Sequence, residues 1–324
     1  MRDEAIGTSN KPHFNWGPET SAAIALVILF TLCSLFVPRF FMITNFRNIL
    51  IQISINATVA VGMNFVILSG GIDLSVGSNV AACGMLMGVL MTKMGWSTFP
   101  SVLCGLLLTT LAGCLNGVLV SKGRLAPFIA TLGTMSILRG FSYLNTKGAP
   151  LFDFPDAFLG FASNIARVPL PIIIMVAVVG SAWYILKYTK LGRYTYSIGG
   201  NEAASVLSGI NVNSYKIAIY SVQGFLCGLA SCILTARLDS AVAVAGESYE
   251  LDAIAAVIIG GTSMNGGQGR VIGTILGVLL MGTLSNAQNL LAIPPGMQRI
   301  IKGLIILAAV YVDTLRKNKS SSAA

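Results

Sequence analysis

Long apolar segments, separated by short polar or glycine-containing stretches, recur along nearly the whole chain. About 20 apolar residues in a row are enough for a helix to cross a bilayer. The pattern predicts about ten spans, at residues 21–37, 48–69, 74–92, 99–120, 127–146, 168–187, 214–235, 250–265, 270–291 and 297–315. The span at 250–265 is short, which is typical of a broken or tilted helix.

The composition supports a membrane protein and excludes an ordinary soluble domain. Of the 324 residues, 54% are hydrophobic and 10% are charged, and the mean hydropathy is +0.77. Soluble domains carry roughly 25% charged residues. A charge at the bilayer centre costs about 2.5–3.5 kcal/mol, so a lipid-facing surface carries few. We therefore expect an all-α membrane protein, a polytopic bundle of about ten transmembrane helices over residues 21–315.

The distribution of basic residues predicts the orientation of the chain. The net charge is +9, and the basic residues lie in short segments between apolar runs. This pattern indicates retention of Lys and Arg on the cytoplasmic side of a membrane, and we expect no nucleic-acid partner. The clusters Lys187–Arg193 and Arg316–Lys319 directly follow predicted spans. Because ten spans put both termini on one side, residues 1–20 and 316–324 are expected to be cytoplasmic tails.

Candidate residues for catalysis or metal binding are scarce. The six cysteines lie in apolar runs without a Cys-x-x-Cys pair, and the single histidine is His13. The glycine-rich stretch 261–270 lacks the Gly-Lys-Ser/Thr ending of a phosphate-binding loop. We expect no bound cofactor or metal, and we do not expect the chain to be an enzyme.

A glycine-containing segment, Ser69–Ser78, interrupts the apolar pattern at a membrane boundary. The pair Gly70-Gly71 permits a turn or an unwound backbone, and Asp73 or Ser75 can cap the helix that follows. Because Asp73 is costly in lipid, its side chain should face protein or water. Two interpretations remain open: a capped turn between helices, or a gate element built from a broken helix.

The polar segment 188–213 contains the signals of a short helix. Asn201 can cap a helix over Glu202–Leu207, and Gly209 can end it. Glu202 then lies in the first turn, where a negative charge interacts favourably with the helix dipole. An ordered helix in a cytoplasmic loop suits docking to a partner protein, and the alternative is an ordinary interfacial helix.

Two segments of the chain resemble each other. Ile67–Ser75 and Ile258–Ser263 each follow an apolar run, contain paired glycines and precede an apolar span rich in small residues. The predicted topology puts both on the same side of the membrane. This similarity suggests an internal repeat of the kind found in many transporters.

Several amides fall inside the predicted spans, and each needs a partner there. Hydrogen bonding between helices is one interpretation, and lining of a path for a neutral sugar is the other. These residues are Gln52, Asn56, Asn64, Asn116, Gln223, Asn286, Gln288 and Asn289.

Four of these segments together resemble a known family. Ser69–Ser78, Leu191–Val212, Tyr249–Gly261 and Gly260–Thr274, in this order, look like the permeases of bacterial ABC importers for monosaccharides. The resemblance covers residues 36–313.

The resemblance implies a permease subunit in the bacterial inner membrane, working with several partners. These are a second, identical permease subunit, a periplasmic sugar-binding protein and a cytoplasmic ATP-binding subunit that uses the ATP. Ribose is the first-choice sugar by resemblance, with allose, xylose and other monosaccharides open.

The resemblance also implies roles for residues at matching positions. The loop that couples to the ATPase would contain Gly199, Gly200, Asn201, Glu202, Ala203, Ala204, Leu207 and Gly209. The translocation path or its gate would contain Asn56, Asn64, Ser69, Gly70, Gly71, Asp73, Ser75, Gly261, Thr262 and Ser263.

An ion-coupled secondary sugar transporter is the alternative. It would need intramembrane carboxylates as a relay. Only Asp73, Asp252 and Asp313 come near predicted spans, and each is close to a span end.

Overall fold

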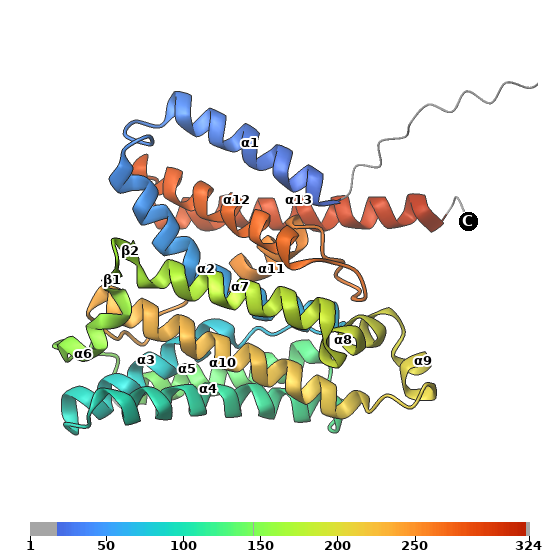
Figure 1. Cartoon of the computed structure of the whole chain (residues 1–324), viewed down its shortest axis with the longest axis horizontal. Helices are drawn as coiled ribbons and strands as arrows, with labels where there is room; N and C mark the ends of the chain where they lie inside the picture. Colours follow the sequence, from blue (N-terminus) through green and yellow to red (C-terminus); the bar gives the residue numbers. More distant parts are fainter. Residues whose placement is uncertain (1–17, 145, 322–324) are drawn as a thin grey trace, which may run out of the picture.

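The computed structural model describes residues 18–144 and 146–321, with side chains as far as Tyr311. It is a helical bundle with one two-stranded hairpin (Figure 1). The long helices are α1 (Pro18–Phe36), α2 (Ile43–Leu68), α4 (Thr98–Ser121), α5 (Pro127–Leu144), α7 (Leu170–Tyr188), α10 (Val212–Leu238), α12 (Val271–Leu290) and α13 (Pro295–Ser321). The shorter elements are α3 (Val76–Gly88) with a π-helical turn over Val89–Lys93, α6 (Asp156–Leu159) with a 3-10 turn over Gly160–Ala162, β1 (Asn164–Ile165), β2 (Val168–Pro169), α8 (Lys190–Gly200), α9 (Glu202–Leu207) and α11 (Tyr249–Ile259).

Seven helical segments within the described residues are long and apolar enough to cross a membrane. They are Glu19–Phe36, Ile43–Leu68, Val76–Lys93, Thr98–Ser121, Leu170–Tyr188, Val212–Leu238 and Val271–Leu290. The chain is therefore a multi-pass membrane protein, and helices suit this environment because they pair their own backbone groups. The other three predicted spans fall on α5, α11 and α13, which are not among the seven. A total of ten spans stays a prediction.

The helices lie in layers (Figure 1). Helices α1, α12 and α13 lie on one side, α3, α4, α5 and α10 lie on the other, and α2 and α7 run between them. We call the end where α7 leads into α8 and α9 the coupling end. The opposite end, which carries α6 and the β1–β2 hairpin, is called the hairpin end.

Glycines set the closest helix contact, between α4 and α10. A Cβ at Gly113 would collide with the Tyr220 carbonyl, and one at Gly224 would collide with the Thr109 carbonyl. The two backbones run antiparallel and approach each other closely because neither glycine carries a side chain. Because α10 packs closely against α4, positions along the α10 axis serve below to locate the neighbouring segments between the two ends of the bundle.

Helix α3 begins in the middle of the bundle. The Ser231 hydroxyl donates to the Val80 carbonyl at 2.7 Å, and Ser231 lies about 28 Å along α10 from Val212. The start of α3, at Val76, is then roughly 22 Å from the coupling end. Residues 69–75, which connect the end of α2 to the start of α3, form no regular helix. Of the two interpretations of Ser69–Ser78, the structure shows a non-helical segment between α2 and α3, and its role as a gate stays a prediction.

Helix α11 is the counterpart of α3. It is about 16 Å long and packs antiparallel to α12, with Gly260 against Gly273 and Ala256 against Gly277. It therefore occupies the half of the bundle nearer the coupling end, and residues 239–248 lead into it from the hairpin end. The short span predicted at 250–265 is a half-helix.

The C-termini of α2 and α11 end in the same hydrogen-bond pattern. The Gly70 N–H donates to Ile67 O and the Gly71 N–H to Val66 O; likewise, the Gly261 N–H donates to Ile258 O and the Thr262 N–H to Val257 O. Gly70 and Gly261 have positive φ angles of 79° and 90°. This pattern is a glycine-terminated helix cap. The local similarity is real, and a duplication of larger extent stays a prediction.

The structure differs from the predicted boundaries of the loop and the C-terminal tail. Residues 188–213, expected as a loop, contain the two helices α8 and α9. Residues 1–17 and 322–324, most of the predicted tails, lie outside the described residues. Helix α13 continues to Ser321, beyond the predicted end of its span at 315, so residues 316–321 are helical.

Candidate functional site

Helix α9 forms as its sequence predicts. Asn201 Oδ1 accepts a hydrogen bond from the Ala204 N–H at 2.9 Å. Gly209 follows the helix with a φ of 78°, which a residue without Cβ adopts at no steric cost. The predicted helix Glu202–Leu207 and both of its capping residues are confirmed.

Helix α9 presents small and apolar side chains to the outside. Ala203 and Ala204 are exposed, and Val206 and Leu207 are 57% and 88% exposed. Helix α9, which carries them, lies at the coupling end and is not among the helices that could cross a membrane (Figure 1). Such a surface suits coverage by a partner protein.

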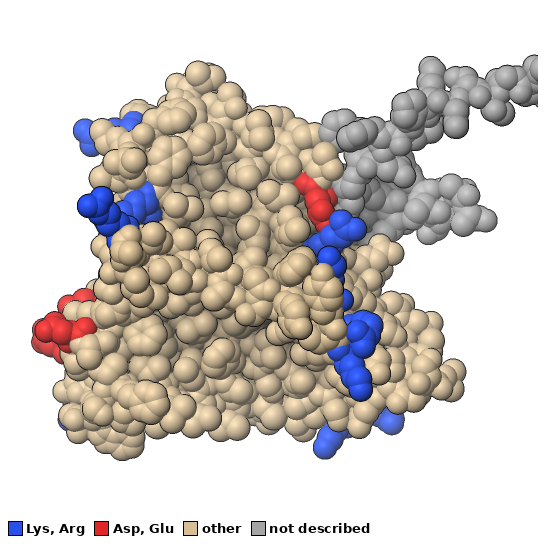
Figure 2. Space-filling view, in the orientation of Figure 1, with Lys and Arg blue, Asp and Glu red and all other residues tan. Residues whose placement is uncertain are grey.

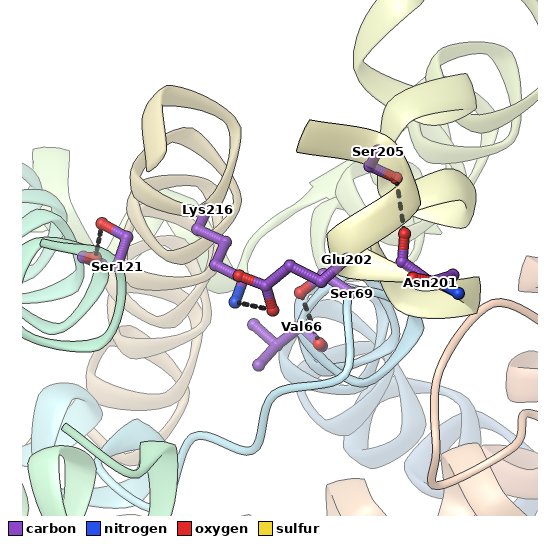
Figure 3. A network of polar contacts seen from close by, with 8 residues as sticks. Val66, Ser69, Ser121, Asn201, Glu202, Ser205 and Lys216 are labelled. Atoms are coloured by element: carbon purple, nitrogen blue, oxygen red, sulfur yellow. Dashed lines mark hydrogen bonds and ion pairs between the residues drawn. The ribbon is translucent and has the colours of Figure 1, made fainter. Parts of the chain in front are cut away.

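Glu202 has a different environment from the rest of the predicted docking set. Its carboxylate lies 2.7 Å from Lys216 Nζ of α10, and Figure 3 shows the two side chains directed toward each other. The Lys216 side chain is largely buried, at 13% exposure, whereas that of Glu202 is 54% exposed. Glu202 therefore ties α9 to the N-terminal part of the central helix α10.

Glycines join α8 to both predicted gate segments. A Cβ at Gly199 would collide with the Leu68 carbonyl, and the Gly267 N–H donates to that same carbonyl at 2.9 Å. A Cβ at Gly266 would lie 2.8 Å from the Gly70 N atom. We call these contacts among Leu68, Gly70, Gly199, Gly266 and Gly267 the glycine junction. Three segments far apart in sequence meet there without intervening side chains.

The turn from α11 to α12 is held on both sides. Thr262 Oγ1 donates to Asn64 Oδ1 of α2 at 2.9 Å, and both side chains are buried. The Tyr196 hydroxyl of α8 donates to the Gly269 carbonyl at 2.9 Å. Burial raises the pKa of Tyr196, so its phenol stays protonated and remains a donor. The turn is therefore anchored to both α2 and α8.

Asp73 belongs to a buried polar network beside α3. Its Oδ1 atom accepts from the Ser75 N–H at 2.8 Å and the Ser75 hydroxyl at 2.6 Å. Asn79 and Asn116 both donate to Ser75 Oγ, and Thr134 donates to Asn116 Oδ1 at 2.6 Å. All five side chains are at most 4% exposed. The network connects the start of α3 with α4 and α5.

The two half-helices meet by their N-termini. A Cβ at Gly77 would collide with the Gly246 carbonyl and would lie 2.7 Å from Glu250 Oε2. Each helix N-terminus carries a partial positive charge of about half an elementary charge. Carboxylates lie next to both: Asp73 precedes α3, and Glu250 and Asp252 are in the first turn of α11. We call this region the half-helix junction.

Arginine and lysine side chains stabilise this junction from neighbouring helices. Arg139 Nη1 of α5 donates to the Ala243 and Ala245 carbonyls at 2.7 and 3.0 Å, in the segment that leads to α11. Lys302 of α13 pairs with Asp252 at 2.8 Å, and both side chains are largely buried. These cations satisfy backbone carbonyls and a carboxylate at a depth where water is scarce.

The structure groups most of the predicted path residues at two levels. Asn64, Ser69, Gly70, Gly71, Gly261, Thr262 and Ser263 lie around the turns at the coupling end, whereas Asp73 and Ser75 lie next to the half-helix junction. Asn56 is half-buried on α2, and no hydrogen bond in the described part of the chain joins it to the others.

Ser75 is the first residue before α3, yet its hydroxyl caps no helical N–H, and Asp73 accepts only from Ser75. Capping of α3 by the Ser75 side chain is therefore wrong, and the Asp73 carboxylate instead accepts the N–H of Ser75, directly before the helix.

Several residues of these sites were missed by sequence reasoning. Arg139 and Lys302 were not singled out from the sequence, and Gly246 carries no local signal that predicts its contact with Gly77. Of the amides in the spans, Asn116 bonds Ser75 and Thr134, and Asn286 bonds Asn45 reciprocally, which confirms hydrogen bonding between helices for these two. No group of three or more potential metal ligands occurs among the described residues.

Comparison with known proteins gives the family. The family described as "Branched-chain amino acid transport system / permease component" matches residues 45–310. The chain belongs to this permease family. The ribose import permease protein of Haemophilus influenzae is 50% identical over 300 residues, covering 91% of this chain and 93% of the relative. The protein of the same name from Escherichia coli K12 is 47% identical over 309 residues, covering 93% and 95%.

A third relative of this permease family extends the comparison to Bacillus subtilis. Its ribose import permease protein is 45% identical over 319 residues, covering 97% of this chain and 98% of the relative. No solved structure matches the chain. The match at 45–310 includes both the glycine junction and the half-helix junction, so both lie inside the permease unit.

Proposed function

We propose that this chain is the membrane permease subunit of an ATP-driven importer for ribose. The observation that carries this proposal is the identity of 45–50% with ribose import permeases over more than nine-tenths of both chains. The permease would work in the bacterial inner membrane with both termini in the cytoplasm. Its partners would be a periplasmic sugar-binding protein, a cytoplasmic ATP-binding subunit that binds and hydrolyses ATP, and a second copy of the chain.

The coupling end would receive the ATP-binding subunit. Supporting this, α9 exposes Val206 and Leu207, and its position is held by the Glu202–Lys216 ion pair. A helix that is exposed on one face and tied to α10 on the other can transmit a push from a partner.

Movement would pass from α9 to the path through the glycine junction. At Gly199, helix α8 touches Leu68 at the end of α2 and Gly267 in the α11–α12 turn through backbone atoms, and the Tyr196 hydroxyl adds a hydrogen bond to that turn. Backbone contact leaves no flexible side chain to absorb a displacement. A shift of α8 would therefore displace α2 and the α11 half-helix together, in an alternating-access cycle.

The half-helix junction would be the element that opens or closes the path. Two helix N-termini near mid-depth, surrounded by hydroxyls, amides and carboxylates, resemble the discontinuous helices at which transporters hold substrate. The ion-coupled alternative is not favoured, because Asp252 is paired with Lys302 and every relative described above is named an import permease.

The experiment is uptake of labelled ribose into vesicles that contain the permease, with and without the cognate ATP-binding subunit and sugar-binding protein. We expect ATP-dependent accumulation that needs both partners. Partner-dependent uptake of another sugar only would replace ribose and retain the importer. Accumulation without either partner would contradict the proposed function.

A further inference from the structure

A cavity of about 440 Å³ opens at the coupling end, between α7, α8 and the start of α12. Its wall contains two cations, Lys187 and Arg270, and two aromatic residues, Trp183 and Tyr196. Lys187 Nζ lies 4.9 Å from the ring centroid of Trp183. The remaining wall is apolar and includes Val271 and Ile272.

The cavity lies at the boundary between membrane and water. Trp183 and Lys187 are in the last turns of α7, and Arg270 directly precedes α12, and both helices are long and apolar enough to span a membrane. Ile272, in the first turn of α12, is 56% exposed. The polar wall is therefore continuous with side chains that face the hydrocarbon region. Trp and Tyr are enriched at this level because their rings have a polar and an apolar part.

The charge of the cavity is unbalanced. Arg270 Nε has one acidic neighbour, Glu19 Oε1 at 3.5 Å, and the Arg270 side chain stays 74% exposed. Lys187 has aromatic contacts, with Trp183 and Tyr188, and no carboxylate partner among the described residues. Lys190 and Arg193 follow on α8 and are exposed. Figure 2 shows Lys and Arg side chains gathered along this end of the molecule.

We propose that this cavity binds the headgroup of an anionic phospholipid. The phosphate would lie against Lys187 and Arg270, polar headgroup atoms would face Trp183 and Tyr196, and an acyl chain would follow Ile272 into the bilayer. Basic pockets between membrane helices on the cytoplasmic side favour such lipids. The inference rests on the proposed function only for assigning the coupling end to the cytoplasmic side.

The test measures lipid retained by the purified chain in detergent, using native mass spectrometry with phosphatidylglycerol or phosphatidylcholine as the added lipid. We expect phosphatidylglycerol to be retained and phosphatidylcholine to be lost. The double variant Lys187→Gln, Arg270→Gln should weaken retention of phosphatidylglycerol roughly 30-fold, because each basic residue near an anionic headgroup contributes about a fivefold factor.

The matched control is Lys122→Gln, Arg124→Gln. It removes the same charge from exposed positions between α4 and α5, outside the cavity. The charge-preserving variant Lys187→Arg, Arg270→Lys should retain the lipid. Equal weakening in the control and the cavity variant would show general attraction to basic residues and overturn the proposal, as would unchanged retention in the cavity variant.

This measurement is independent of transport. It uses neither ribose, ATP nor any partner protein, so a chain that imports no ribose can still be tested for the lipid. A chain that imports ribose and retains no phosphatidylglycerol would overturn the lipid site alone.

Discussion

At the glycine junction three backbones touch directly, whereas at the half-helix junction the backbone contact of Gly77 with Gly246 is surrounded by buried side chains that form hydrogen bonds. The first region depends on the absence of side chains at Gly199, Gly266 and Gly267. The second depends on the presence of Arg139, Asp73 and Ser75. Backbone contacts suit transmission of movement, and side-chain hydrogen bonds suit rearrangement, because a side chain can exchange partners without displacing the backbone. The comparison leads to four predictions, ordered by their expected effect on stability.

The largest effect is expected at Gly199. Gly199→Val places side-chain atoms where the Leu68 carbonyl and the Gly267 amide lie, so α8 must separate from α2. We expect a loss of about 3 kcal/mol or more in the free energy of unfolding, together with loss of uptake. Thermal unfolding in detergent and vesicle uptake would measure both.

Gly200 offers the matched control for this substitution. A Cβ there would meet nothing within 4 Å, and the residue is exposed. Gly200→Val should leave the free energy of unfolding almost unchanged. If Gly199→Val were tolerated equally well, the glycine junction would not be a rigid connection.

The second prediction concerns Arg139. Arg139→Ala leaves the Ala243 and Ala245 carbonyls without their charged donor, and we expect a loss of about 2–3 kcal/mol in the free energy of unfolding. Arg139→Lys should recover part of it, because one ammonium can reach a carbonyl but lacks the planar guanidinium. Protease sensitivity of residues 239–248 provides a second measurement. Unchanged cleavage of that segment in Arg139→Ala would show that Arg139 does not hold residues 239–248 in place.

The third prediction concerns Asp73. Asp73→Ala leaves the buried N–H and hydroxyl of Ser75 without their acceptor, at a cost of about 2 kcal/mol. Asp73→Asn keeps an acceptor oxygen of the same shape and should be milder in thermal unfolding. If uptake were lost equally in both variants while only Asp73→Ala was destabilised, the carboxyl group itself would be needed for transport.

The smallest effect on stability is expected on α9, where one substitution tests the Glu202–Lys216 ion pair and another tests the exposed Leu207 side chain. Glu202→Gln removes the pair with Lys216 and should cost about 0.5 kcal/mol, because the Glu202 side chain is more than half exposed. Leu207→Asp should leave unfolding unchanged, since Leu207 is 88% exposed, yet it should weaken binding of the ATP-binding subunit. Co-purification with that subunit distinguishes the two. Normal co-purification of Leu207→Asp would show that α9 is not the docking surface.

Local signals were sufficient for some parts of these sites. The capped helix Glu202–Leu207 was predictable, because caps depend on neighbouring residues, whereas for Ser69–Ser78 the sequence left a capped turn and a broken helix as alternatives. The pairing of Arg139 with residues 243 and 245, and the contact of Gly77 with Gly246, were not predictable. They join residues more than a hundred positions apart, and no short pattern records which helix lies beside which.

The sequence alone determined that the chain is a multi-pass helical membrane protein with an ordered helix at residues 202–207, because hydropathy, glycine position and helix capping act over short stretches. The tertiary structure alone decided the depth at which α3 and α11 begin and the close backbone approach of Leu68, Gly199 and Gly267. It also decided that Glu202 pairs with Lys216 of the same chain, while the expected contact of Glu202 with a partner stays a prediction. Such outcomes follow from how helices pack around α10, and packing depends on the whole set of contacting side chains and glycines at once.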